Sequence, residues 1–446
     1  MTEDRIARVV DAAVEERIDR RRLIRRAGAA SLALGLAPYV ATTRAFASTR
    51  TIKIGWVSPV TGPLASFGEA DKYTVKVMQR LFSKGIRAGK NTYPVEILLR
   101  DSQSSTNRAA TVAQSLILDD SIDLMLVSST PLTANPVSDV CEANGMPCIA
   151  SDVPWQAWFF GRKGDPAKPF KWTYQFFWGL EDIISVFLDI WSQVPTNRVV
   201  GALYPNDPDG NAWGDKKLGF PPPLKKAGYT LIDPGRYPQP NDDFSSQIAK
   251  FKKVNAQIVS GVPLPPDFNT FWKQALQQGL RPPVATIARA LLFPSDVEAL
   301  GNDGANVSTE VWWHPGMPYR SSLTKQTGAA LATQWTKTTK KQWTQPIGYA
   351  HALFEVAANV FARTTNLDDK ESIVAAIKGT NLNTAAGLVS WRGGPKKNPV
   401  ANVSKMKLAG GQWRKGKKYK YEMVVISNKE IPGLQRGGKL LPIKYS

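Results

Sequence analysis

The residue types that most often carry catalysis or bind metals are scarce in this chain. It has two histidines, His314 in WWHPG and His351 in GYAHALF, and two cysteines, Cys141 and Cys148. Neither histidine stands beside a cysteine or carboxylate pattern that would build a triad or a metal site. GxSxG, HExxH, the phosphate-binding pattern GxxxxGK followed by Ser or Thr, and a GxGxxG after a strand are also missing from the sequence. We therefore expect no catalytic residue, no metal site and no cofactor.

The two cysteines lie close together in the sequence, in SDVCEANGMPCIAS. Cys141 is expected near the end of a helix and Cys148 on the strand that follows it, so the two sulfur atoms could come within bonding distance. In an oxidising compartment they would then form a disulfide. Two separate buried thiols are the alternative, and the sequence leaves both open.

Polar residues gather where predicted strands end. The segment 52–57 alternates as a strand does, breaks at Ser58 and leads through SPVTGPLASFGE into a helix at 73–81. Two later apolar runs, 122–127 and 146–150, end in SST and SD. In an open α/β sheet the carboxyl ends of the strands and the N-termini of the following helices face the ligand crevice. These loops are therefore expected to line a pocket.

The elements that position these loops alternate between strand and helix along most of the chain, which predicts a doubly wound α/β architecture. In the first part, a strand is expected at 93–100, and helices at 108–118, capped by Thr106 or Asn107, and at 134–143. A second set of strands is expected at 198–204, 229–232, 257–262 and 284–288, with helices at 181–191, 244–254 and 268–278. The chain is expected to cross between the two sets near 176–179 and again at 307–313. Later helices are expected at 324–337, 348–363 and 370–378.

The N-terminal segment 1–47 is typical of an export signal rather than of a folded domain. Arg20 and Arg21 stand before Arg22, Leu23, Ile24 and Arg25, the pattern of a twin-arginine signal, and a mild apolar stretch follows at 27–40. The sequence Ala-Phe-Ala at 45–47 would release Ser48 as the first mature residue. No apolar run reaches the roughly 20 residues that a membrane span needs. We expect an exported, periplasmic protein that does not span the membrane.

Composition and charge exclude little by themselves. The chain has 446 residues, 43% of them hydrophobic, and a net charge of +20, so it can bury more than one core. The basic residues are scattered rather than striped, which favours a solvated surface over a nucleic-acid partner.

The tail 403–426 reads as a hairpin with turns at Gly410-Gly411 and Lys415-Gly416. A polyanion could be bound there by Arg414, Lys415, Lys417, Lys418 and Lys420 with Trp413, Tyr419 and Tyr421, but a solvated hairpin is the preferred interpretation.

Two stretches of the chain carry a resemblance to a known family. IKIGWVSPVTGPLASFGE at 52–69 and RDSQSSTNRAATVAQSLI at 100–117 resemble the opening of the branched-chain amino-acid type of periplasmic binding protein. The resemblance implies a type I periplasmic binding protein fold, in which two doubly wound α/β lobes are joined by three crossing strands. It places 48–176 plus 312–395 in the first lobe and 177–311 plus 396–446 in the second. Gly387–Trp391 resembles the late strand that closes the first lobe.

The resemblance also implies a solute site between the lobes. The residues expected to contact the solute are Trp56, Phe67, Ser129, Thr130, Ser151, Asp152, Trp155, Trp213, Arg289 and Tyr349. Amino-acid receptors of the family generally carry an acidic residue in the loop where this chain has Arg289, and Pro131 and Pro154 lie near the positions of carboxylate-gripping hydroxyls. A carboxylate paired with Arg289, or a neutral or aromatic solute stacked among Trp56, Phe67, Trp155 and Trp213, is therefore expected rather than a free branched-chain amino acid.

The implied function is that of a receptor, not of an enzyme. Members of the family bind a small solute and dock on the permease subunits of an ABC importer. A ligand-sensing module of the same fold and, less favoured, a cell-envelope enzyme are the alternatives, since fold alone does not separate them. A sensor would normally be fused to a membrane or effector segment, and an enzyme should turn over small amides, acids or esters.

Overall fold

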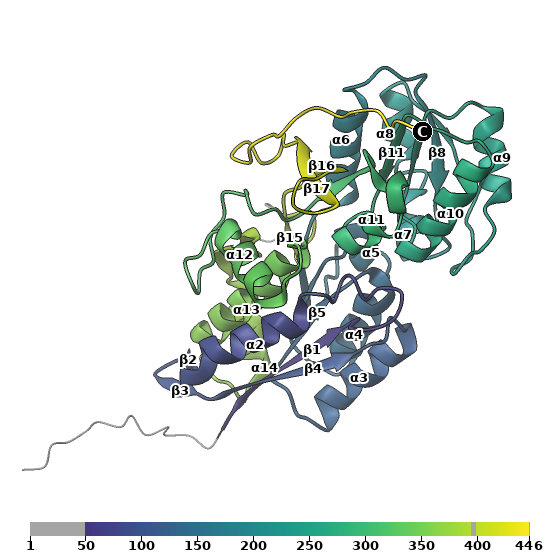
Figure 1. Cartoon of the computed structure of the whole chain (residues 1–446). Helices are drawn as coiled ribbons and strands as arrows, with labels where there is room; N and C mark the ends of the chain where they lie inside the picture. The colour runs from purple at the N-terminus through teal and green to yellow at the C-terminus, as the bar shows by residue number, and fades with distance from the viewer. Residues whose placement is uncertain (1–49, 394–397, 446) are drawn as a thin grey trace, which may run out of the picture. The chain divides into compact units, whose positions relative to one another are not determined.

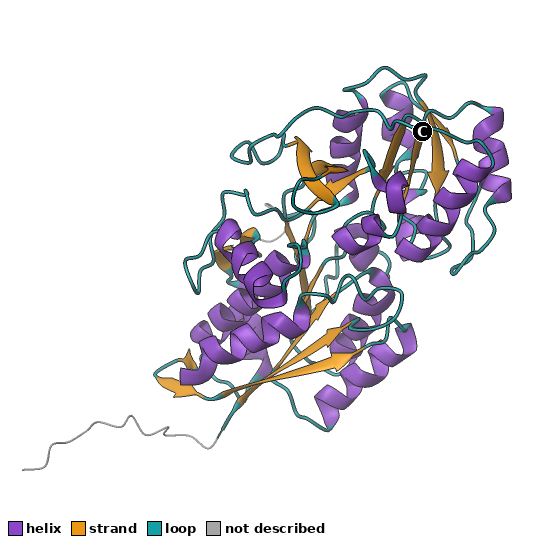
Figure 2. Ribbon diagram, viewed as in Figure 1, coloured by secondary structure: helices purple, strands orange, loops and turns teal. Residues whose placement is uncertain are grey.

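The computed structural model describes residues 50–393 and 398–445, which fold into two α/β lobes, each built on its own sheet (Figure 1, Figure 2). The predicted twin-arginine signal, with Arg20, Arg21 and the cleavage site after Ala47, lies outside these residues. The expected two-lobed α/β fold is confirmed.

The first lobe contains a six-stranded sheet in the order β15-β7-β6-β5-β1-β4, and every pair of neighbours is parallel. The strands are β1 (Ile52–Ser58), β4 (Val95–Asp101), β5 (Leu124–Ser128), β6 (Cys148–Ser151), β7 (Thr173–Phe177) and β15 (Val403–Lys405). Because all strands run the same way, their carboxyl ends meet at one edge of the sheet. The loops predicted to line a pocket therefore come together there.

Helices cover both faces of this sheet, which explains the apolar strands. Side chains of β5 alternate between two cores: Leu124 and Leu126 join the one under α2 and α13, and Met125 and Val127 join the one under α3 and α4. The helices of the lobe are α2 (Asp71–Leu81), α3 (Thr106–Leu118), α4 (Pro131–Ala143), α5 (Trp155–Phe159), α12 (Gly328–Thr339), α13 (Pro346–Arg363) and α14 (Lys370–Lys378). The helix α13, far along the chain, thus packs beside α2 (Figure 1).

The second lobe contains a seven-stranded sheet in the order β17-β16-β12-β11-β10-β8-β9. The strands from β9 to β12 are parallel, and β16 and β17 add an antiparallel edge. The strands are β8 (Val199–Leu203), β9 (Thr230–Ile232), β10 (Ile258–Gly261), β11 (Val284–Ile287), β12 (Ser308–Val311), β16 (Ala409–Lys415) and β17 (Tyr421–Ser427). The helices are α6 (Leu180–Trp191), α7 (Pro208–Trp213), α8 (Pro221–Lys226), α9 (Ser245–Lys253), α10 (Pro265–Gln277) and α11 (Pro294–Glu298).

Short elements complete the lobes. β2 (Ile86–Ala88) and β3 (Asn91–Tyr93) form one antiparallel ladder, and β13 (Asn381–Thr384) and β14 (Gly387–Ser390) form another. Two 3-10 turns lie at η1 (Phe82–Lys84) and η2 (Gly301–Gly304). No helix in the described part of the chain is both long and apolar enough to cross a membrane.

The chain passes between the lobes three times, after β7, after β12 and after β15. β15 pairs in parallel with β7, so residues 403–405 belong to the first sheet although the expected bounds put 396–446 in the second lobe. The other lobe bounds remain a prediction. Three crossings within one body allow the lobes to move about a common hinge.

Three local expectations are corrected. β14, within Gly387–Trp391, pairs with β13 rather than with the first sheet, and β15 is the late strand of that lobe. Gly410 and Gly411 lie inside β16 at a bulge, where a Cβ on Gly410 would fall 2.7 Å from Ile190 of α6. The side chain of Ser105, rather than of Thr106 or Asn107, caps α3 by accepting from Arg108 N at 3.3 Å.

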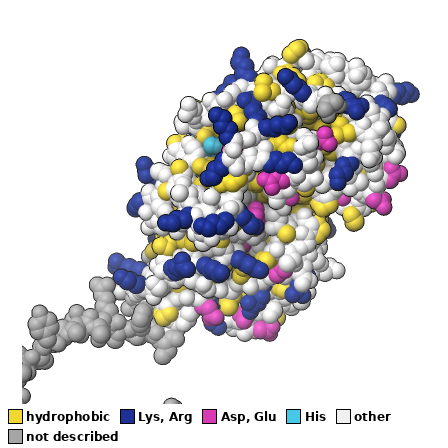
Figure 3. Space-filling view, viewed as in Figure 1, with side chains coloured by type: hydrophobic (Ala, Val, Ile, Leu, Met, Phe, Trp, Pro, Cys, Tyr) yellow, Lys and Arg dark blue, Asp and Glu magenta, His cyan; other side chains and the backbone are white. Residues whose placement is uncertain are grey.

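Of the three rings expected on the hairpin β16–β17, Tyr419 is partly exposed, and the other two are not available to a polyanion. Trp413 and Tyr421 are each 1% exposed, and their polar atoms donate to the carbonyls of Leu291 and Gly301. Lys and Arg side chains are spread over both lobes on the face shown in Figure 3. These observations favour the solvated-surface interpretation of the basic composition.

Candidate ligand-binding site

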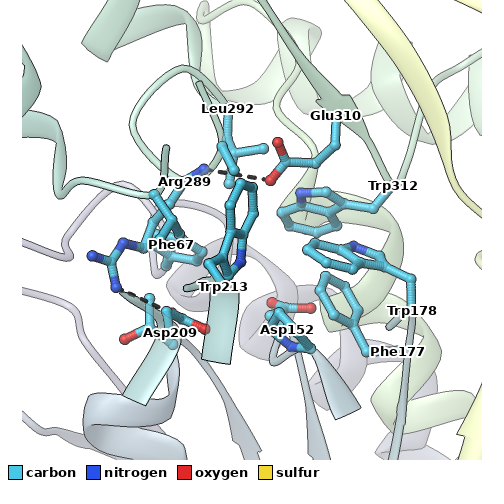
Figure 4. Close-up of a pocket in the computed structure, with 14 residues that line it drawn as sticks. Phe67, Asp152, Phe177, Trp178, Asp209, Trp213, Arg289, Leu292, Glu310 and Trp312 are labelled. Atoms are coloured by element: carbon cyan, nitrogen blue, oxygen red, sulfur yellow. Dashed lines mark hydrogen bonds and ion pairs between the residues drawn. The ribbon is translucent and has the colours of Figure 1, made fainter. Parts of the chain in front are cut away.

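The carboxyl ends of the strands of both sheets enclose a cavity between the lobes (Figure 4). The space open to the centre of a water molecule is about 20 Å³, which is room for about one water. A larger solute can enter only if the lobes separate. The first lobe contributes residues after β1, β5, β6 and β7, and the second contributes residues after β8, β10 and β11 and at the end of β12. The lining residues are Phe67, Thr130, Asp152, Pro154, Phe177, Trp178, Asp209, Trp213, Val262, Ala288, Arg289, Leu292, Glu310 and Trp312.

Five of the fourteen residues that line the cavity are aromatic. Trp178 and Trp312 lie together with Phe177 on one side, and Trp213 lies between them and Arg289 (Figure 4). Phe177 packs edge-on against Trp312 with ring centroids 5.5 Å apart, and Trp213 stacks on Phe220 at 4.4 Å. The rings are held by neighbours rather than by a ligand, so the wall is formed in advance.

Arg289 is fully engaged within its own lobe. Its Nη1 donates to Asp207 Oδ2 at 2.8 Å and to Asp209 Oδ2 at 3.0 Å, and its Nε donates to the Pro263 carbonyl at 3.3 Å. In the amide orientation that hydrogen bonding favours, the oxygen of Gln239 accepts from Nη2 at 3.2 Å. Burial lowers the pKa of Arg289, but the two carboxylates outweigh burial and raise it. These contacts argue against the expectation that Arg289 pairs with a solute carboxylate.

Carboxyl groups face the cavity from both lobes. Asp152, at a positive φ of 65°, accepts from Ser151 Oγ at 3.0 Å, and burial raises its pKa to about 7. Glu310 accepts from Thr309 Oγ1 at 2.8 Å and from the backbone N–H of Arg289 at 3.4 Å, and burial raises its pKa to about 7 as well. The charge that lines this cavity is therefore acidic or neutral.

A wider groove of about 520 Å³ lies between α5 of the first lobe and α7 of the second. Its lining includes Asp207, the ion-pair partner of Arg289, and two of the exposed large apolar side chains, Phe160 and Leu218. The groove has the size of a small-molecule pocket. The groove adjoins the enclosed cavity, because Asp207 lines the groove and Asp209, two residues later, lines the cavity.

Five of the ten predicted solute contacts line the cavity, and five do not. Phe67, Thr130, Asp152, Trp213 and Arg289 belong to the lining. The other five lie outside the lining, in the first lobe. Trp56 donates to Ser128 Oγ at 3.2 Å, Trp155 donates to Glu181 Oε1 at 3.1 Å, Tyr349 stacks on Phe176, and Ser129 and Ser151 are buried.

Several lining residues were missed by sequence reasoning. Trp178 and Trp312 follow strands that cross towards the other lobe, Asp209 lies in the first turn of α7, and Glu310 lies in β12. None of the four belongs to a sequence motif. The segments that cross between the lobes could be recognised in the sequence, but nothing there distinguishes their tryptophans from the others.

Cys141, Cys148 and His351 are buried within the fold, and His314 is partly buried. Cys141 and Cys148 are free thiols, and burial together with a hydrogen bond to the Cys148 sulfur raises the pKa of Cys141. Of the two alternatives for this pair, the structure therefore shows separate thiols. His351 lies 2.8 Å from Ser321 Oγ, and burial lowers the pKa of His351 and of His314 to about 4. No cluster of three or more potential metal ligands occurs among residues 50–393 and 398–445.

Comparison with known families identifies the class of the protein. Residues 51–416 match the model of the periplasmic binding proteins, and the chain belongs to this family. The resemblance drawn from the sequence is thereby confirmed. A comparison with curated proteins found no match.

Solved structures agree on the fold. The chain is 15% identical to a leucine binding protein from Thermotoga maritima, with a TM-score of 0.66 over 85% of this chain and 99% of the other. It is 14% identical to a branched-chain amino acid transporter substrate binding protein from Streptococcus pneumoniae in complex with isoleucine, with a TM-score of 0.65 over 85% and 100%. It is 15% identical to a solute binding protein of an ABC transporter from Rhodopseudomonas palustris in complex with 3,4-dihydroxybenzoic acid, with a TM-score of 0.65 over 84% and 96%.

Proposed function

We propose that this protein is the extracytoplasmic solute receptor of an ABC importer, which closes on a small solute and delivers it to the permease subunits. The observation that carries the proposal is the cavity itself, whose lining comes from the strand ends of both lobes. A solute that touches both lobes stabilises their closed arrangement, and the three crossings provide the hinge. Membership of the periplasmic binding protein family supports the same function.

We further propose that the solute has an aromatic or other flat apolar body rather than being a free branched-chain amino acid. The tryptophan and phenylalanine rings of the cavity support this choice. The relatives with bound ligands hold an amino acid in one case and an aromatic acid in the other, so likeness to them does not decide. The expected carboxylate depended on Arg289, whose charge Asp207 and Asp209 already compensate, so the proposal keeps the aromatic part alone.

The receptor function is tested by identifying what the protein carries. The mature protein is purified from the periplasm without added ligand, denatured, and the released small molecules are identified by mass spectrometry. The compound found is then titrated into stripped protein while the radius of gyration is followed by X-ray scattering. We expect stoichiometric binding and compaction, as for a hinge that closes. A stripped protein that binds nothing from a periplasmic extract and never compacts contradicts the proposal.

The export route is a separate proposal. Replacing Arg20 and Arg21 by Lys should strand the precursor in the cytoplasm, because twin-arginine recognition reads the paired guanidinium groups rather than their charge. Replacing Arg5 and Arg8 by Lys is the matched control and should leave export intact. The measurement is the ratio of precursor to mature chain in cell fractions, with N-terminal sequencing to locate Ser48. Normal maturation of the Arg20/Arg21 variant contradicts the twin-arginine route.

A further inference from the structure

The hydrogen bonds of the tryptophans separate three of them from the rest. The chain has 14 Trp, and in nine of them the indole Nε1–H donates to another residue of the protein. Two more, Trp172 and Trp343, are only partly buried. The remaining three, Trp178, Trp213 and Trp312, are at most 3% exposed and have no partner for Nε1.

These three tryptophans line the same cavity (Figure 4). They come from separate elements: Trp178 follows β7, Trp213 ends α7, and Trp312 follows β12. Buried polar groups are nearly always hydrogen-bonded in native proteins, since an unmet donor costs free energy. Three unmet donors at one cavity, in a protein whose other buried indoles are all satisfied, are best explained if a ligand provides the acceptors.

Other polar atoms of the cavity indicate which further groups the ligand carries. Thr130 Oγ1 and Asp209 Oδ1 are also buried without a partner. Asp152 and Glu310 add carboxyl oxygens that can accept hydrogen bonds from donor groups. The ligand must therefore carry acceptors for the indoles and donors for the carboxyl groups.

The charges of the cavity disfavour an anionic ligand. Among the described residues that line it, Arg289 is the only base, and Asp207 and Asp209 already compensate its charge at 2.8 and 3.0 Å. Asp152 and Glu310 supply further negative charge when they ionise. An anion enclosed here would meet no uncompensated positive charge, and burial of an unpaired charge is costly.

We infer that the solute is an uncharged, flat molecule with several neutral oxygen acceptors and at least one hydrogen-bond donor, such as an aromatic amide or polyphenol, and that the indole N–H groups of Trp178, Trp213 and Trp312 bind its oxygens. This inference rests on the proposed receptor function and specifies the solute class for the same cavity. The rings of the three tryptophans supply the flat apolar surface, and their N–H groups supply the specificity.

The solute class is tested with two probes that differ in one group, a neutral amide in one and a charged carboxylate in the other. 3,4-Dihydroxybenzamide and 3,4-dihydroxybenzoate are titrated separately into stripped wild-type protein at pH 7.5 and followed by calorimetry, with choline and L-leucine as further probes. We expect the amide to bind at least about tenfold more tightly than the benzoate, because only the benzoate brings an unpaired charge into the cavity. Equal or tighter binding of the benzoate overturns the inference, and so does preferred binding of choline or leucine or failure of the amide to bind.

The role of the indoles is tested with Trp178→Phe, Trp213→Phe and Trp312→Phe, which keep an aromatic ring but remove the donor. Each should weaken amide binding by about 2- to 12-fold, the value of one hydrogen bond. Trp335→Phe is the matched control: its Nε1 donates to the Gln342 carbonyl at 2.8 Å, outside the cavity, so amide affinity should not change. If the three variants fold and bind the amide as the wild type does, the inferred role of the indoles is wrong.

These outcomes separate the solute class from the receptor function. Binding of the benzoate with compaction of the lobes would overturn the uncharged class and leave the receptor function in place. Loss of compaction with every compound recovered from the periplasm would instead remove the receptor function. Should a Trp→Phe variant not fold, the comparison of amide and benzoate on the wild type still decides the class.

Discussion

Removing the guanidinium of Arg289 tests whether this residue holds the second lobe together or binds the solute. In Arg289→Ala, the carboxylates of Asp207 and Asp209 remain buried, each with its side chain 4% exposed, and lose the cation that compensates them. Breaking one partner of a buried ion pair typically costs about 3–5 kcal/mol of unfolding free energy. Burial already raises the pKa of Asp209 to about 7 although Arg289 opposes this, so the cost should be larger at pH 8 than at pH 5.

The assay is urea unfolding of the stripped protein, followed by circular dichroism at both pH values. Arg236→Ala is the matched control in the same lobe, because Arg236 pairs with Asp233 at 3.1 Å near the surface, with its side chain 24% exposed, and should cost no more than about 1 kcal/mol. A triple variant that combines Arg289→Met, Asp207→Asn and Asp209→Asn removes all three charges and should recover most of the lost stability. If Arg289→Ala costs less than about 1 kcal/mol but abolishes binding of the solute, Arg289 is a solute contact and our assignment of its role is wrong.

Two further predictions concern closure of the lobes and the response to pH. Ser66 of the first lobe donates to Asp296 Oδ1 of α11 at 2.9 Å, so Ser66→Ala should reduce the ratio of closed to open protein about fivefold, measured by X-ray scattering; an unchanged distribution would contradict a latch at this contact. Burial raises the pKa of Glu310 to about 7 from an ordinary 4.5, so the folded state holds this proton where the unfolded chain has released it. The stabilising effect is therefore complete below pH 4.5 and is lost as the pH rises through 7. Between pH 5 and 8 the unfolding free energy of Glu310→Gln should therefore fall less than that of the wild type, by up to about 3 kcal/mol. Equal slopes for variant and wild type would show that Glu310 stays ionised in the folded protein.

The sheets could be predicted because their strands carry local signals. The apolar run at β5 reflects burial of this strand on both faces. The turn residues after β1 mark the passage from a strand to a helix. Both signals are contained in a few consecutive residues. α14 was expected at 370–378 and is observed there. β15 was not predicted because a three-residue strand has no periodicity, and its place is fixed by pairing with β7, more than 200 residues earlier. Gly410 was taken for a turn because only the packing of α6 shows why glycine is needed inside a strand.

The charge state of the site depended on contacts that the sequence does not display. Arg289 was read as an available base from its own loop, because nothing near it in the chain is acidic. Its partners, Asp207 and Asp209, lie about 80 residues earlier, at the N-cap and in the first turn of α7, which follows β8. The sheet order β11-β10-β8 brings the two loops to the same edge with one strand between them, and only then does a buried ion pair form. A base in a cleft is thus a binding group only after its neighbours in space are known.

The role of each tryptophan also depends on contacts that only the folded chain shows, and these contacts decide the chemistry of the site. From the sequence, Trp56 and Trp155 were as good candidates as Trp213, since all three were expected near strand ends or in the aromatic region. In the folded chain Trp56 and Trp155 donate to Ser128 and Glu181, whereas Trp213 has no partner for its indole N–H and faces the cavity. A ring can fill a core without a ligand, but a buried donor without an acceptor is stable only at a cost. The unmet donors, rather than the number of rings, therefore distinguish the solute-binding tryptophans from those of the core.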